Sequence, residues 1–259
     1  MKKRTNEEKE NPKKDYLFML AVFILIIILL SSIYYSVSNI SKEKEYVEKT
    51  PSFVSMDGAT LVTMNLPAVN QQGEGVTTTL SVEAMHGNGR VLLDIDDLLF
   101  WADTEHSMRK ARIVAGNISG IDVKKYDIIY NIDANASLIG GESAGAALAV
   151  ATIAALQNKS LKEDVMITGT INHDGSIGPI SGVLEKAKAS KEIGVNLFLV
   201  PLLQSVDVVY ETVQHCEKFG WTEICTTEQI PQKVNVGDKA EIRIEEVGTI
   251  DEALKYFFE

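Results

Sequence analysis

Two stretches of the sequence decide the fold. Residues 140–147 read Gly-Gly-Glu-Ser-Ala-Gly-Ala-Ala, and residues 174–189 read Asp-Gly-Ser-Ile-Gly-Pro-Ile-Ser-Gly-Val-Leu-Glu-Lys-Ala-Lys-Ala. The first stretch places Ser143 at the first turn of an Ala-rich helix that we predict over residues 143–157. The second places Lys186 near the start of a helix predicted over residues 183–193. The other strands and helices of the domain are predicted from the pattern of apolar, polar and turn-forming residues.

The remaining pattern is a mixture of strands and helices without strict alternation. Gly- and Asn-rich turns, such as those at 72–75 and 86–89, separate the segments. This order favours an α+β domain over a doubly wound parallel sheet. The predicted strands are 59–65, 76–84, 90–95, 126–134, 165–171, 197–200 and 241–247, and the other predicted helices are 107–117 and 250–257.

The chemistry expected of Ser143 follows from its place at a helix start. The first N–H groups of a helix have no helical partner and carry a partial positive charge. They can therefore stabilise an oxyanion that forms beside the serine, and the preceding glycines let a substrate carbonyl approach. The same residues also fit an ordinary helix N-cap after a Gly-Gly loop.

Lys186 is the candidate base for this serine. A serine hydroxyl is a weak nucleophile and needs a base within hydrogen-bonding reach. A lysine serves only when its amine is neutral near pH 7, which burial among apolar groups promotes. The Ala-, Val- and Leu-rich surroundings of Lys186 predict partial burial. The alternative is a surface lysine paired with Glu185 or Glu192.

A second serine motif occurs at residues 107–110. Ser107 and Lys110 fit the S-x-x-K pattern of β-lactamase-like enzymes, but the companion S-D-N and K-T-G elements are absent from the sequence. We therefore interpret this segment as a solvated helix face.

The two decisive stretches together resemble the proteolytic domain of Lon peptidases. That family has a serine in an x-Ser-Ala-Gly motif and a lysine 43 positions later, which matches Ser143 and Lys186. A family threonine that hydrogen-bonds the lysine lies 18 positions before it, which matches Thr168. The extended motif is most similar to that of stand-alone, membrane-anchored archaeal members. The resemblance extends from about residue 59 to the end of the chain.

The resemblance implies both a fold and a site. The implied fold is a two-layer sandwich related to the GHMP kinase fold. The implied site is a Ser143–Lys186 dyad supported by Thr168 and by the residues around the serine, which are Gly141, Glu142 and Ala144. Glu142 and Ser181 depart from the family pattern. A carboxylate at Glu142 close to Lys186 would favour the charged amine and oppose catalysis.

The resemblance also implies function and partners. We expect a serine endopeptidase that acts on unfolded or flexible proteins, without a cofactor and in a homo-oligomeric ring. No G-x-x-x-x-G-K-[ST] motif occurs in the chain, so ATP-driven unfolding would come from a separate ATPase partner, if at all. Two other readings stay open. One is a GHMP-like kinase that holds phosphate at residues 140–147, and the other is a catalytically inactive membrane scaffold.

The amino-terminal part predicts a membrane anchor. Residues 16–41 carry no formal charge, whereas residues 1–15 contain six Lys or Arg. We expect a basic tail at 1–15, a transmembrane helix at 16–37, a linker at 38–52 and the proteolytic domain at 53–259. The charge bias favours a cytoplasmic amino terminus and an extracytoplasmic catalytic domain.

The composition excludes some functions and leaves the cysteines open. A net charge of −11 gives no electrostatic basis for nucleic-acid binding. The four histidines are scattered without an HExxH or CxxC motif, so we expect no metal site. Cys216 and Cys225 fit either one disulfide or two unpaired buried thiols.

Overall fold

The computed structural model describes residues 23, 25–32, 58–94, 99–100, 102–133, 138–139 and 141–258. The chain divides into two compact units, Met1–Ser52 and Phe53–Glu259. In the first unit, residues 23 and 25–32 are helical and exposed. Most of the predicted transmembrane helix 16–37, and all of the predicted tail 1–15 and linker 38–52, lie outside the described residues. No helix in the described part of the chain has the length and apolar character needed to cross a bilayer.

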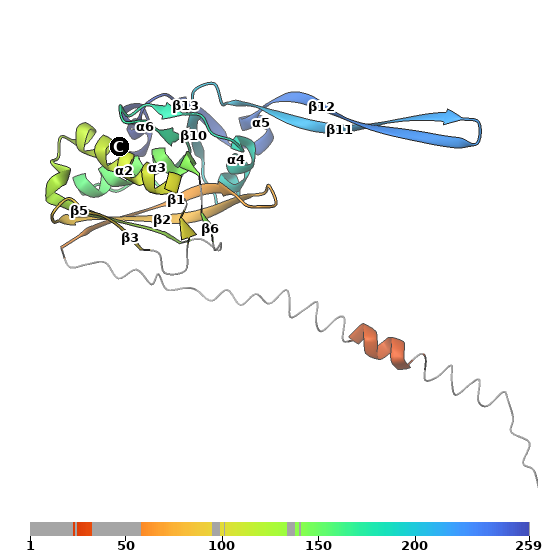
Figure 1. Cartoon of the computed structure of the whole chain (residues 1–259), viewed down its shortest axis with the longest axis horizontal. Helices are drawn as coiled ribbons and strands as arrows, with labels where there is room; N and C mark the ends of the chain where they lie inside the picture. Colours follow the sequence, from red (N-terminus) through yellow and green to blue (C-terminus); the bar gives the residue numbers. More distant parts are fainter. Residues whose placement is uncertain are drawn as a thin grey trace, which may run out of the picture. The chain divides into compact units, whose positions relative to one another are not determined.

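The second unit contains a four-stranded sheet in the order β1-β2-β5-β3 (Figure 1). Its strands are β1 (Thr60–Val69), β2 (Gly75–His86), β3 (Val91–Asp94) and β5 (Tyr126–Asp133). The β1–β2 and β2–β5 pairs are antiparallel, and β3 pairs with β5 in parallel. The four predicted strands in this region are confirmed, and β1 is longer than predicted because its pairing with β2 continues to Val69.

A second sheet is parallel and has the order β13-β10-β7. It consists of β7 (Val165–Ile167), β10 (Leu197–Pro201) and β13 (Arg243–Val247). All five residues of β10 are buried, as expected of a central parallel strand. The single strand predicted over 165–171 is wrong. Strand β7 ends at Ile167, and β8 (Thr170–Ile171) pairs instead with β9 (Ile177–Gly178).

Helix α3 (Gly145–Gln157) packs on strands of both sheets. Every residue from Gly145 to Leu156 is buried, because the helix is apolar on all sides and has no solvated face. Helix α3 thus joins the two sheets in one core, and the two-layer sandwich that the resemblance implied stays a prediction. The other elements around these sheets are α2 (Ala102–Ser119), α4 (Val183–Glu192), α5 (Val236–Ala240), α6 (Ile250–Phe257), the 3₁₀ turns η1 (Val123–Lys125) and η2 (Glu142–Ala144), and the short pair β4 (Leu99–Phe100) and β6 (Leu138–Ile139).

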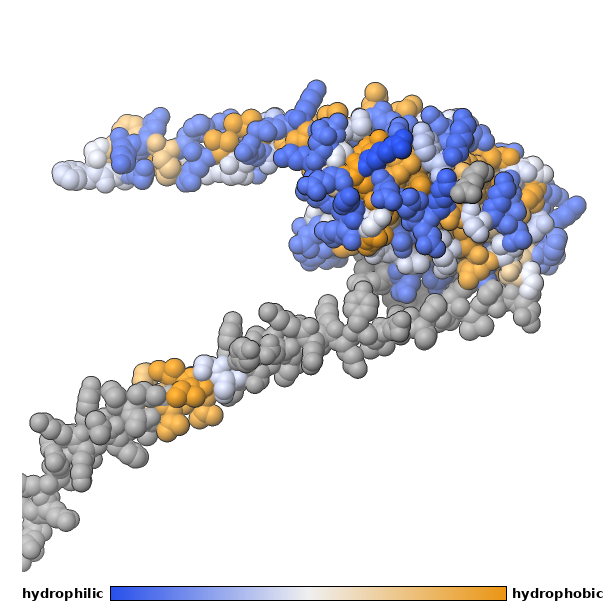
Figure 2. All heavy atoms as spheres, turned by 180° about the vertical axis from the view of Figure 1, so that it is seen from behind, coloured by the Kyte–Doolittle hydropathy of each residue, from blue (hydrophilic) through white to orange (hydrophobic). Residues whose placement is uncertain are grey.

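A long β-hairpin, which we call the arm, extends from this body (Figure 1). It consists of β11 (Val206–Phe219) and β12 (Thr222–Asn235), which pair in antiparallel register along their whole length. Gly220 and Trp221 form the connecting turn. Only the base of the arm packs on the body, through Val209 and Val234, and Figure 2 shows hydrophilic and apolar residues interspersed along it. The sequence pattern did not predict this arm.

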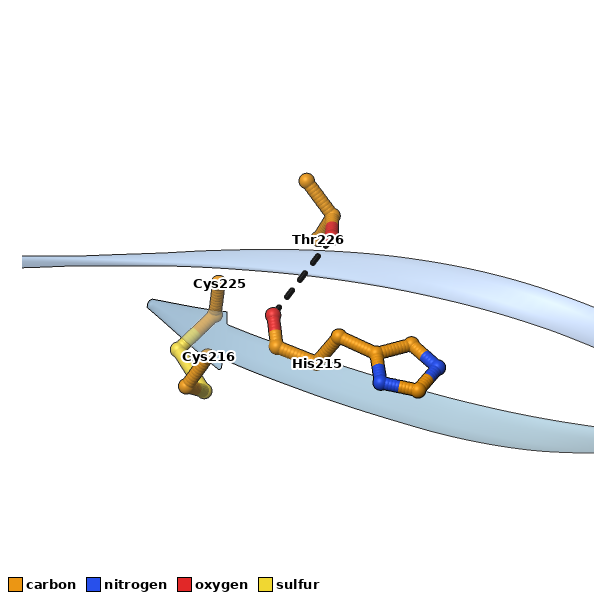
Figure 3. Close-up of a disulfide and its surroundings, with 4 residues drawn as sticks. All are labelled: His215, Cys216, Cys225 and Thr226. Atoms are coloured by element: carbon orange, nitrogen blue, oxygen red, sulfur yellow. Dashed lines mark hydrogen bonds between the residues drawn. A yellow bond between two sulfur atoms is a disulfide. The ribbon is translucent and has the colours of Figure 1, made fainter. Parts of the chain in front are cut away.

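The two cysteines form a disulfide across the arm (Figure 3). Cys216 and Cys225 lie directly opposite each other in the register, with a Cα–Cα distance of 4.1 Å. Both are exposed, so the alternative of two unpaired buried thiols is wrong. The neighbouring pair is also linked, because the Thr226 hydroxyl donates to the His215 carbonyl at 3.4 Å.

Candidate active site

The turn that carries Ser143 is shaped by two glycines. Gly141 has a φ of 106°, a value that glycine adopts far more readily than other residues. A Cβ at Gly145 would lie 2.6 Å from Ile171 Cγ2, so the start of α3 approaches β8 more closely than a side chain would allow. Ser143 and Ala144 are half-buried in the turn η2, and α3 begins two residues after the serine. Their N–H groups thus belong to the first turn of a helical segment, where helical partners are lacking.

The Ser143 turn is tied to the end of β7. The Ser143 carbonyl accepts from the Gly169 N–H at 2.9 Å and from the Thr168 hydroxyl at 3.2 Å. The Ala146 N–H in turn donates to the Gly169 carbonyl at 3.0 Å. Thr168, which is 1% exposed, was expected to hydrogen-bond Lys186. Its hydroxyl donates instead to the backbone of Ser143, so the role that the structure gives it is to hold the serine turn.

Lys186 is buried on α4, with only 4% of its surface exposed. The apolar side chains packed there include Val183, Leu184 and Ala187 from its own helix, and Met166 from β7. Loss of hydration disfavours the ammonium form, and this burial lowers the pKa of Lys186 to about 8. The partial burial predicted from the sequence is thus confirmed. A substantial fraction of the amine is neutral slightly above pH 7, as a general base requires.

Helix α4 packs mainly on β2, β1 and α5, and one contact with β7 predicts that Lys186 lies near the level of Thr168. The Ser190 hydroxyl lies 3.0 Å from Met166 Sδ, which fixes one point of contact. Strands β7 and β10 are parallel and α4 connects them, so α4 runs in the opposite direction to both. Moving from Ser190 to Lys186 covers about 6 Å of helix, and moving from Met166 to Thr168 covers about 6.6 Å of strand in the same direction.

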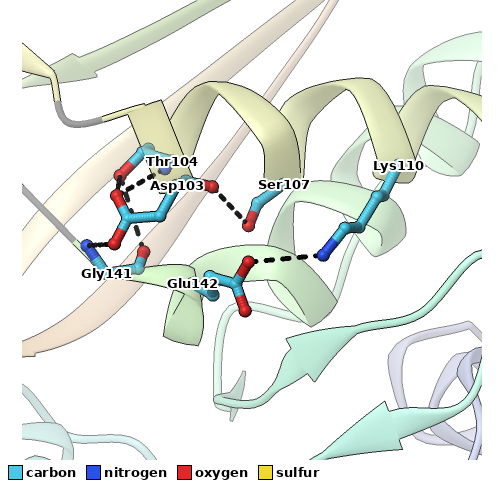
Figure 4. A network of polar contacts seen from close by, with 6 residues as sticks. All are labelled: Asp103, Thr104, Ser107, Lys110, Gly141 and Glu142. Carbon is cyan, nitrogen blue, oxygen red and sulfur yellow. Dashed lines mark hydrogen bonds and ion pairs between the residues drawn. The ribbon is translucent and has the colours of Figure 1, made fainter.

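Helix α2 clamps the Ser143 turn from the other side (Figure 4). The Gly141 N–H donates to Asp103 Oδ2 at 3.1 Å, and Lys110 Nζ lies 3.3 Å from Glu142 Oε1. Ser107 is 1% exposed, and its hydroxyl donates to the Asp103 carbonyl at 3.0 Å. The interpretation of the Ser107–Lys110 motif as a solvated helix face is therefore wrong. The sequence offered no signal for this clamp, because Lys110 and Glu142 are 32 residues apart.

The clamp also shows whether the Glu142 carboxylate keeps Lys186 charged. Its carboxylate pairs with Lys110, and burial is the cause of the lowered pKa of Lys186. Glu142 therefore does not hold the Lys186 amine in its charged form.

The reactive atoms themselves have no partners within the described residues. Neither the Ser143 hydroxyl nor the Lys186 amine hydrogen-bonds to a side chain or carbonyl that the structure describes. Direct contact between them thus stays a prediction. In the same part of the chain, no group of three His, Cys, Asp or Glu side chains is placed to hold a metal ion.

Comparison with known proteins identifies the family. The model of the Lon protease (S16) C-terminal proteolytic domain matches residues 68–218, more than half of the chain. The chain belongs to this Lon proteolytic-domain family. The match contains Ser143, Thr168 and Lys186, and it ends within β11. It is shorter than the range of the resemblance, which extended to the carboxyl end.

Individual Lon proteases are similar to the same region. The Lon protease of Lawsonia intracellularis is 30% identical over 182 residues, which cover 69% of this chain and 19% of that protein. The archaeal Lon protease of Methanocaldococcus jannaschii is 36% identical over 89 residues (34% of this chain, 14% of that protein), and that of Thermococcus kodakarensis is 27% identical over 126 residues (49% and 20%). The matched regions thus make up a fifth or less of these Lon proteins. These similar proteins are Lon proteases, which favours the peptidase reading over the kinase reading.

Proposed function

We propose that this Lon-family chain is a serine endopeptidase in which Ser143 is the nucleophile and Lys186 its general base. The observation that carries the proposal is a buried lysine whose lowered pKa leaves the amine partly neutral near pH 7. This lysine lies on α4, whose Ser190 contacts Met166 in β7, and the residues that follow β7 bond to the Ser143 turn. Burial of a lysine without an ion-pair partner is costly, and such groups concentrate at functional sites.

The proposed reaction follows from the residues at the turn. Lys186 takes the hydroxyl proton as Ser143 Oγ attacks the peptide carbonyl. The negative charge on the carbonyl oxygen is stabilised by the N–H groups of Ser143 and Ala144 in the first helical turn. The Lys186 ammonium then gives its proton to the leaving amine. Water completes the cycle by hydrolysing the acyl-enzyme, with Lys186 again acting as base.

Covalent labelling tests the assignment of the nucleophile. A fluorophosphonate should label the full chain at one residue, and the label should be found on the peptide that contains Ser143. Labelling at Ser107 or at any other serine would overturn the proposal. Failure to label at any pH up to about 9, where the lysine is largely neutral, would do so as well.

The membrane anchor is part of the proposal. Residues 23 and 25–30 expose large apolar side chains within the uncharged region 16–41, which supports a single span over 16–37. The exposed Cys216–Cys225 disulfide supports an extracytoplasmic catalytic domain, because such bonds persist in oxidising compartments. The amino terminus would then be cytoplasmic. Both features rest on charge bias and redox chemistry.

Substrates and partners follow from the family likeness. We infer that the chain cleaves unfolded or flexible proteins, that it works as a homo-oligomeric ring, and that any ATP-driven unfolding comes from a separate ATPase. Hydrolysis of an unfolded protein by the full chain should therefore proceed without ATP. A strict requirement for ATP with the purified chain alone would contradict this part of the proposal.

Lys110 offers a test of how the site keeps Lys186 neutral. Lys110→Gln leaves the Glu142 carboxylate without its partner, next to the serine turn. A free negative charge near the site favours the protonated amine, so the pH at half-maximal activity is expected to rise by about 0.5–1. The measurement is the pH dependence of kcat/KM for a peptide substrate.

Two further variants are the controls for Lys110. Lys110→Arg keeps the charge and should keep the wild-type profile. The double variant Lys110→Gln/Glu142→Gln removes both charges. It should return the pH at half-maximal activity to the wild-type value. An unchanged profile in Lys110→Gln, or a shift that persists in the double variant, would show that Glu142 does not influence the amine.

A further inference from the structure

The tip of the arm carries an exposed apolar cluster that the peptidase chemistry does not use. We call Phe219, Trp221 and Ile224 the tip cluster. Their exposed fractions are 63%, 106% and 53%, so Trp221 touches almost nothing of its own chain. Phe219 lies opposite Thr222 in the register and Ile224 follows two residues later, so Phe219 and Ile224 share one face as diagonal neighbours. Trp221 lies beside them in the turn.

The disulfide points to the tip as a functional part of the arm. A two-stranded hairpin by itself is at best marginally stable in water. Cys216 and Cys225 join the strands three residues before Phe219 and three residues after Thr222. The bond therefore holds the distal end, far from the base where Val209 and Val234 pack on the body. The tip also lies beyond the residues that match the family model, which end at 218.

Charge distinguishes the tip from the rest of the arm. Residues 219–222 are uncharged, and the nearest charges are Glu217, Lys218 and Glu223. The whole arm has more acidic than basic residues, which gives no attraction to an anionic surface. The uncharged tip can therefore insert into an apolar phase, and the charged residues behind it limit the depth of insertion. The depth available before these charges, from Trp221 to Glu223, is about 7 Å along the strand, which matches shallow interfacial insertion, and Ile224 lies just behind this level, opposite Glu217.

The amount of apolar surface favours lipid over a protein partner. Three such side chains present about 500 Å² in total, whereas a stable protein interface buries about 800 Å² on each partner. Tryptophan with an apolar body and one N–H group is characteristic of membrane–water interfaces.

We propose that the tip cluster inserts into the interfacial region of a neutral lipid bilayer and forms a second membrane contact of this chain. The contact depends on Phe219, Trp221 and Ile224, with the disulfide holding them together. It does not depend on the charge of the lipid. It is also independent of the peptidase activity, so it stands or falls by itself.

Trp221 is its own reporter, because the sequence has only two tryptophans, Trp101 and Trp221. The experiment uses full-length Trp101→Phe reconstituted into phosphatidylcholine vesicles, with and without brominated phosphatidylcholine. Trp221 emission should move to shorter wavelength and lose intensity with brominated lipid. Bromines high on the acyl chain should quench more than bromines near its methyl end. If Trp101→Phe fails to fold, the difference between wild type and Trp221→Phe gives the same signal.

Matched variants separate the tip from the rest of the arm. Phe219→Ser in the Trp101→Phe background should reduce the quenching of Trp221. Tyr210→Ser removes an aromatic residue that is 66% exposed near the base of the arm, and it should leave the quenching unchanged. Trp221 that stays unquenched by bromine and open to aqueous iodide would overturn the proposal. So would a blue shift that appears without lipid and grows with protein concentration, since that shift indicates contact between chains.

Discussion

Replacing Ser143 by alanine is expected to lower the rate of peptide hydrolysis by about 10⁴–10⁶-fold. The variant keeps the 3₁₀ turn, the bond from Thr168 to the Ser143 carbonyl and the start of α3, because these involve the backbone. Only the attacking hydroxyl is lost. The measurement is the initial rate of hydrolysis of a fluorogenic unfolded protein at pH 8, together with the melting temperature of the variant.

Ser107→Ala is the matched control for this prediction. Ser107 belongs to the other Ser-x-x-Lys motif, is also close to the turn through Asp103, and bonds only to a backbone carbonyl. Its removal should leave hydrolysis within a few-fold of wild type. A comparable loss in Ser107→Ala, or appreciable activity in Ser143→Ala, would reject the assignment of the nucleophile.

Replacing Lys186 by methionine is expected to abolish hydrolysis and at the same time stabilise the fold. Burial lowers the pKa of Lys186 from 10.5 to about 8, so the unfolded chain binds the proton more tightly than the folded chain. The resulting cost to folding is about 3 kcal/mol below pH 8. It declines as the pH rises from about 8 to 10.5. Methionine fills a similar volume without a charge and removes the cost.

The stability part of this prediction has a distinct pH signature. Denaturant unfolding of wild type and Lys186→Met should differ by about 3 kcal/mol at pH 7 and much less at pH 10.5. Lys188→Met is the control, because Lys188 is exposed on the same helix and its charge is already solvated. A variant at Lys186 that is less stable than wild type at pH 7 would mean that the amine is well solvated or paired, contrary to the account.

The candidate site was largely predictable from local sequence and from spacing. Gly141 and the Ala-rich segment after Ser143 predicted a helix start, and the structure has η2 and α3 there. The apolar residues around Lys186 predicted its burial. The pairing of Ser143 with Lys186 was inferred from the resemblance to Lon peptidases, because a separation of 43 residues has no local physical signature.

The features that sequence reasoning missed depend on distant contacts. The Lys110–Glu142 ion pair joins α2 to the serine turn. No residue close in sequence to Lys110 or Glu142 indicates that the two side chains pair. The arm was missed because residues 206–235 mix charged, apolar and small polar side chains without a clean alternation. Such a pattern is what a hairpin exposed on both faces produces. With the arm unrecognised, the pairing of Cys216 and Cys225 could not be decided.

The central claim is that a neutral, buried Lys186 amine serves as the base for Ser143. The most direct measurement is the pH dependence of kcat/KM for peptide hydrolysis, which reports the ionisation of the free enzyme. The account predicts that the rate rises tenfold per pH unit at low pH and levels off with an apparent pKa of about 8, the value to which burial lowers the pKa of Lys186. A rate that levels off below pH 7, or a residual rate in Lys186→Met with the same pH dependence, would contradict it.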